Sequence, residues 1–164
     1  MPYVSFYEHF PEIAEREIRT FTILEQSLSD LPPGQYALVE MYCDERGCDC
    51  RRVFFYVISS SIKDVGAIIA YGWERPEFYA RWMGDDDPEI IKDLQGPVLN
   101  MCSPQSILAP AILEIVKDII LRDSAYIKRI KTHYKMFRDK IDRNPRLKRR
   151  MRKKKRKRQT PVGL

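Results

Sequence analysis

Three cysteines within eight residues constrain this chain more than any other feature of its sequence. Cys43, Cys48 and Cys50 follow the spacing C-x4-C-x-C and lie between two apolar, strand-like segments. Zinc in proteins prefers four thiolate or imidazole ligands in a tetrahedron. Ligands so close in sequence require a bend in the backbone, and Gly47 can adopt the positive φ of a tight bend at little cost. The sequence therefore predicts a turn between two strands that holds a metal ion.

The expected geometry of the turn follows from strand periodicity. Cys43 would end one strand, and Cys48 and Cys50 would begin the next. Residues two apart in an extended segment point to the same side, so this pair can face one ion together. Three neighbouring guanidinium groups would offset part of the negative charge of the thiolates: Arg46, Arg51 and Arg52.

Three thiolates leave one tetrahedral position open, and we expect His133 to fill it. His133 lies three residues after Ile130 and four before Phe137, so it shares the inward face of the last predicted helix. An inward imidazole has to be hydrogen-bonded or metal-bound to avoid a desolvation cost. Cys102 and His9 are the other candidates for the fourth ligand. An ordinary histidine at the edge of the core remains an open alternative.

Other interpretations of the cysteines also remain open at this point. Free cysteine packs as a small apolar residue, so the three thiols can be inert members of a hairpin. A disulfide, or a redox-active pair formed by Cys48 and Cys50, is a further alternative for these thiols.

Length and composition favour one domain with appendages. The chain has 164 residues, of which 44% are hydrophobic, enough to form a core. It contains no run of about 18 uncharged apolar residues, so we expect no membrane span. The first ten residues lack the basic and apolar regions of a secretory signal. Four unevenly spaced cysteines without such a signal favour a reducing, cytoplasmic setting.

We predict an α+β fold for residues 1–143, with a four-stranded antiparallel meander followed by a C-terminal helical part. Segments rich in β-branched and aromatic residues are joined by short connections, which favours antiparallel pairing. The expected strands are 17–24, 36–42, 52–59 and 64–72.

The second half of the chain has helical patterns. A short helix is expected over 75–83, and another should begin at Asp87-Pro88, where the aspartate can cap it and proline suits its first position. We read the preceding aspartates as part of this helix start rather than as a magnesium site. Residues 106–121 predict a helix that is apolar nearly all round and hence buried, and 124–141 predict a final helix with one apolar stripe.

The charge of the chain is sharply divided. Residues 146–158 contain 11 Lys or Arg among 13 residues, whereas the rest of the chain has 18 basic and 23 acidic residues, a net charge of −5. Such a block repels itself, so we expect residues 144–164 to form a disordered tail. Against phosphates it would release counterions and bind independently of sequence. An acidic protein, an anionic membrane surface or no partner at all remain alternatives. The expected nucleic-acid-binding residues are Arg146, Lys148, Arg149, Arg150, Arg152, Lys153, Lys154, Lys155, Arg156, Lys157 and Arg158.

One segment resembles a known group of proteins. Residues 42–53, with Tyr71-Gly72-Trp73-Glu74 and Pro104-Gln105-Ser106 downstream, are similar to a group of small uncharacterised prokaryotic proteins. The resemblance covers about residues 5–140 and excludes the tail. It implies a shared fold and a shared metal site, and it implies no activity.

Three hypotheses of function follow from the sequence. The first is a zinc-stabilised binding module that associates with nucleic acid or ribonucleoprotein through its basic tail. The second is an enzyme, either a metal-dependent hydrolase or a thiol oxidoreductase; it is weakened because the sequence has no His-Glu-x-x-His pattern and no phosphate-binding loop. The third is an interaction protein of a larger assembly that docks through its acidic body.

Overall fold

A computed structural model describes residues 3–143 of the chain as an α+β fold around one antiparallel sheet. The strands run in the order β1-β3-β4-β5-β6, and β2 also pairs with β3. The expected antiparallel α+β architecture is confirmed, but the sheet of the described region has six strands rather than four. Their bounds are β1 Tyr3–Ser5, β2 Arg19–Ile23, β3 Gly34–Cys43, β4 Arg52–Ser59, β5 Ala67–Gly72 and β6 Val98–Leu99.

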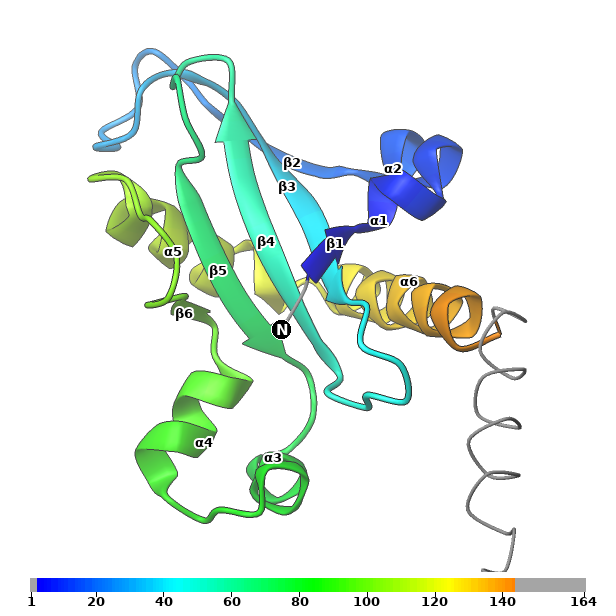
Figure 1. Cartoon of the computed structure of the whole chain (residues 1–164). Coiled ribbons are helices and arrows are strands. Elements are labelled where there is room, and N and C mark those ends of the chain that lie inside the picture. Colours follow the sequence, from blue (N-terminus) through cyan, green and yellow to red (C-terminus); the bar gives the residue numbers. More distant parts are fainter. Residues whose placement is uncertain (1–2, 144–164) are drawn as a thin grey trace, which may run out of the picture.

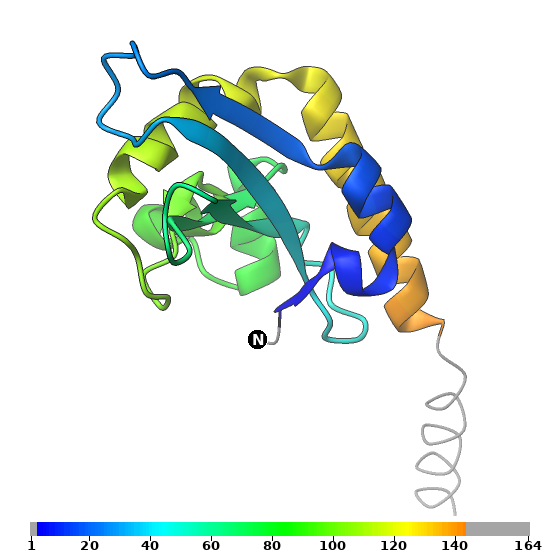
Figure 2. The same ribbon diagram turned by 90° about the horizontal axis from the view of Figure 1, so that it is seen from above.

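The long strand β3 lies between β4 on one side and, on the other side, two short strands that share its edge. β2 pairs with residues 34–38 and β1 with residues 41–43, while β4 runs along the opposite edge. Val39 and Glu40 therefore have no partner in β1 or β2. The intervening chain leaves the sheet as two short helices, α1 Phe6–His9 and α2 Pro11–Glu17. Figure 2 shows these helices beside α6 (Ser124–Asp142) at this edge.

Two helices cover one face of the sheet. α5 (Ala109–Asp118) and α6 lie behind the strands in Figure 1, joined by the 3₁₀ turn η1 (Ile120–Arg122). The remaining helices, α3 (Pro76–Met83) and α4 (Pro88–Gln95), follow β5 at one end of the sheet. The predicted start of α4 is confirmed, because the Asp87 side chain accepts a hydrogen bond from the Glu89 backbone and Pro88 is the first helical residue.

The core fills the space between the sheet and the helices α5 and α6. Its members are apolar side chains of β3, β4, β5, α5 and α6 that are almost entirely shielded from water, among them Tyr36, Leu38, Tyr42, Phe55, Ile69, Ile112, Val116, Ile130 and Phe137. Burial of each such side chain contributes about 1.5–3 kcal/mol to stability.

The helix expected over 106–121 differs from the prediction. It is shorter, and Ile107 and Ile119 are 95% and 62% exposed, so it is not buried all round. The helical backbone breaks at Ile119, where φ is −121° and ψ is −60°, and the chain tightens into η1. This break turns the Ile119 side chain away from the core.

Within residues 3–143, no helix is both long and apolar enough to cross a membrane. The predicted basic tail, residues 144–164, lies outside the described residues.

Candidate metal centre

The turn between β3 and β4 brings the three predicted ligands together. The sulfur atoms of Cys43, Cys48 and Cys50 all lie within 4.8 Å of one another, and none of them forms a disulfide. Cys43 and Cys50 are buried and Cys48 is half-buried. Zn–S bonds of about 2.3 Å in a tetrahedron place sulfurs about 3.8 Å apart, so three sulfurs this close fit around one ion. The three cysteines are thus close enough to hold a metal ion.

The turn has the positive φ that was expected at Gly47, but Cys48 and Cys50 do not begin the next strand, because β4 starts only at Arg52. Gly47 adopts a φ of +69°, which costs glycine little. Arg51 also has a positive φ, +47°, and its peptide groups are held on both sides: its carbonyl accepts a hydrogen bond from the Tyr79 hydroxyl at 3.0 Å, and its amide donates to the Tyr134 oxygen at 3.2 Å. These contacts fix the direction in which the chain presents Cys50.

Helix α6 holds the turn from the other side through a charged pair. The Arg138 guanidinium donates to the carbonyl oxygens of Cys43 at 2.6 Å and Glu45 at 2.8 Å. It also pairs with Asp142 at 2.9 Å, and Asp142 accepts a hydrogen bond from the Gly47 amide at 3.0 Å. The final helix is therefore joined to the cysteine turn by Arg138 and Asp142.

The surroundings of the three thiols favour one thiolate. A hydrogen bond with the Cys50 thiol lowers the pKa of Cys43, and the Glu45 amide and the charge of Arg138 act in the same direction against the effect of burial. The same hydrogen bond, together with burial, raises the pKa of Cys50. Burial and the charge of Cys43 raise the pKa of Cys48. Since a cation favours the ionised form of all three thiols, its binding would release protons.

The positive charge that stabilises the Cys43 thiolate comes from a different residue than the sequence suggested. Arg51 is paired with two carboxylates, and Arg52 reaches a backbone carbonyl of α4, while Arg46 is exposed. The guanidinium that lowers the pKa of Cys43 belongs to Arg138. Arg138 is 88 residues from Cys50 in the sequence, so the charges adjacent to the cysteines do not reveal it. The available signal was an Arg-Asp pair spaced four apart on the last helix.

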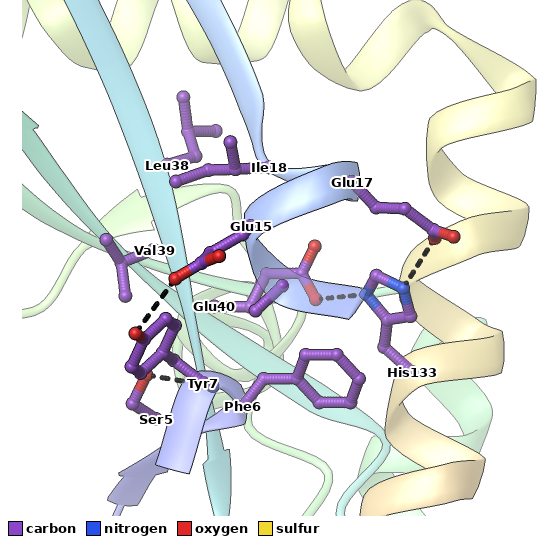
Figure 3. A pocket seen from close by; sticks show the side chains of 11 residues that line it. Ser5, Phe6, Tyr7, Glu15, Glu17, Ile18, Leu38, Val39, Glu40 and His133 are labelled. Atoms are coloured by element: carbon purple, nitrogen blue, oxygen red, sulfur yellow. Dashed lines mark hydrogen bonds and ion pairs between the residues drawn. The ribbon is translucent and has the colours of Figure 1, made fainter. Parts of the chain in front are cut away.

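The structure does not bring His133 to the three sulfurs. Its Nδ1 contacts Glu40 Oε2 at 2.8 Å and its Nε2 contacts Glu17 Oε2 at 3.0 Å (Figure 3). The ring is inward, with 3% of its side chain exposed, and it is hydrogen-bonded as its position required. His133 therefore lies between two carboxylates, that of Glu40 on β3 and that of Glu17 on α2. It does not complete the metal site as expected from the sequence.

The other two candidates for the fourth ligand also lie apart from the cysteine cluster. His9 is half-buried at the end of α1, where its ring meets the Phe137 ring edge-on at 5.2 Å between centroids. Cys102 is exposed on the loop that follows β6. Among residues 3–143, the cluster of potential ligand atoms consists of the three cysteines alone.

Comparisons of the chain with protein-family models, with curated proteins and with solved structures find no match. The resemblance to small prokaryotic proteins stays a prediction. Function has to be inferred from the residues of the chain itself.

Proposed function

We propose that this protein is a zinc-stabilised binding module, in which Cys43, Cys48 and Cys50 hold one Zn²⁺ and the basic segment 146–158 associates with nucleic acid or ribonucleoprotein. The observation that carries the zinc part is the gathering of three unpaired sulfurs within 4.8 Å on a turn that is anchored to α3 and α6. Thiolates are soft ligands, and zinc is a common metal of such sites.

The chain's own residues fit the ion in several ways. The Glu45 amide and the Arg138 guanidinium already stabilise a thiolate at Cys43. Cys48 is half-buried, so an ion can reach the cluster from the surface. Bound zinc would join the three thiolates and fix the turn against the ends of β3 and β4. Three thiolates supply much charge to the ion and weaken its Lewis acidity, which favours a structural role.

The nucleic-acid part of the proposal is supported by the distribution of charge along the sequence. Eleven basic residues are concentrated in 146–158, and the remaining chain is acidic. A polyanion would therefore be drawn to this one segment, and neutralised phosphates would release counterions.

The zinc part is tested by elemental analysis of the purified full-length chain. We expect about one zinc per chain, and its loss in the variants Cys43→Ser, Cys48→Ser and Cys50→Ser. Cys102→Ser is the matched control and should keep the metal, since this thiol lies outside the cluster. A metal-free wild-type chain would contradict the proposal, and a reversible Cys48–Cys50 disulfide at a cytosolic potential would then support the thiol-redox alternative.

The nucleic-acid part is tested by fluorescence anisotropy with a labelled single-stranded RNA and a labelled DNA duplex. Six to ten phosphate contacts predict a loss of affinity of about 10³–10⁵ between 50 and 200 mM salt. A full-length variant with all Lys and Arg of 146–158 replaced by Gln should lose binding while keeping its zinc. Unchanged binding by this variant would refute the role of the segment, and preferential binding of the wild type to anionic vesicles would favour a membrane surface instead.

A further inference from the structure

A cavity of about 450 Å³ opens at the gap in the edge of the sheet. It lies where β3 has no partner at Val39 and Glu40, between α2 and α6, and it shares no lining residue with the cysteine turn. Its walls are mainly apolar, formed by side chains such as Phe6, Ala14 and Leu38. A volume of this size is within the range of small-molecule sites in proteins.

One carboxylate provides a polar anchor inside this apolar space. Glu40 Oε2 accepts hydrogen bonds from the Tyr42 hydroxyl at 2.7 Å and pairs with His133 at 2.8 Å. The Glu40 side chain is only 7% exposed. Within residues 3–143 its second oxygen, Oε1, has no hydrogen-bond partner, and Figure 3 shows it turned away from the His133 ring. A carboxylate oxygen that faces a mainly apolar cavity can accept a hydrogen bond from a donor that enters the cavity.

The charges around the cavity select the sign of a ligand. Three carboxylates line it, those of Glu15, Glu17 and Glu40, and among the described lining residues His133 is the basic one. Burial opposes a charge on His133, but its hydrogen bonds and proximity to Glu40 and Glu17 outweigh this and raise its pKa. Even with a protonated imidazole, the lining carries an excess of negative charge. An anionic ligand such as a fatty acid would be repelled.

We propose that this cavity binds a small organic cation whose ammonium group donates to Glu40 Oε1 and whose apolar body packs against α2 and β3. The carboxylate is already oriented by the Tyr42 hydroxyl and the His133 ring, so little ordering is needed on binding. Glu17, with 31% of its side chain exposed at the end of α2, lies at the more open side of the imidazole. The site is independent of the cysteine cluster and of the proposed function.

The test is calorimetry and ligand-observed NMR on the full-length chain with a matched series of small probes. The series compares 2-phenylethylamine, 2-phenylethanol and 3-phenylpropionate, which share a phenyl body and differ in the polar group, and it is repeated with alkylamines and their matched alcohols and carboxylates. The amines should bind saturably, the alcohols about tenfold or more weakly, and the carboxylates not measurably, since a charge-assisted hydrogen bond contributes at least a factor of about ten.

Variants locate the binding. Glu40→Gln removes the charge at nearly constant shape and should weaken amine binding by about tenfold or more. Ala14→Phe places a bulky side chain at another lining position, leaves the Glu40 carboxylate in the chain and should abolish binding, which keeps the test decisive if the first variant is unstable. Glu12 is an exposed acidic residue on α2, the helix that also carries Ala14. Its substitution Glu12→Gln is the control and should bind as the wild type does. Equal binding of amines and alcohols, absence of amine binding across the series, or full binding by Ala14→Phe would overturn the proposal.

Discussion

Replacing Arg138 by methionine should reveal how strongly α6 holds the cysteine turn. The Arg138 side chain is only 9% exposed, and its guanidinium donates to the carbonyls of Cys43 and Glu45. Hydrogen bonds to a charged group contribute about 1.5–3 kcal/mol each. Asp142 is 42% exposed, so the ion pair itself adds little. Methionine retains most of the apolar stem, and we therefore expect a loss of about 3–5 kcal/mol in the free energy of unfolding.

Urea denaturation followed by circular dichroism measures this loss. The matched control is Arg143→Met, because Arg143 pairs with Asp139 at 3.5 Å on the same helix but is 80% exposed. This control should cost less than about 1 kcal/mol. The Arg138→Met variant should also bind zinc more weakly than the wild type, since the turn is then free to move. Equal, small effects of the two substitutions would refute the assigned role of Arg138.

The His133 pair, the close approach at Gly72 and the bound zinc can each be tested by stability measurements. The pKa of His133 is raised above 6.5 and that of Glu17 is lowered below 4.5. Their pairing therefore stabilises the fold most between about pH 4.5 and 6.5. The unfolding free energies of the wild type and Glu17→Gln should converge as the pH rises through the folded pKa of His133 or falls through that of Glu17. Gly72→Ala should cost about 1–3 kcal/mol in a urea titration, because the new Cβ would meet the Tyr79 hydroxyl. Removing zinc with a chelator should lower the melting temperature of the wild type and leave Cys50→Ser unchanged.

Much of the architecture could be predicted because its signals are local. The strongly apolar segment 52–59 coincides with β4, and the capping pair Asp87-Pro88 starts α4 where expected. The short strands β1 and β6 were missed, since two or three residues carry no recognisable alternation and exist as strands only by pairing with β3 and β5. The sequence therefore could not reveal that two strands share one edge of β3, nor the gap between them.

The candidate site could be predicted only where its residues are close together in the sequence. Cys43, Cys48 and Cys50 are neighbours in sequence, so their spacing alone could place them on one turn. The partner of His133 depends on which strand residue faces α6, a matter of tertiary packing. Glu40 lies two residues from both Leu38 and Tyr42 and shares their buried face of β3. This inward carboxylate was the available signal for a polar partner of an inward histidine.

X-ray absorption at the zinc edge of the full-length protein identifies the atoms that bind the metal. The cysteine turn predicts about three sulfur scatterers at about 2.3 Å from the metal, with one lighter neighbour to complete a tetrahedron. The sulfur signal should be absent in Cys48→Ser, which is expected to lose the ion, and unchanged in Cys102→Ser. A metal surrounded only by nitrogen and oxygen, or a protein that takes up no zinc, would contradict the assignment of the three cysteines as its ligands.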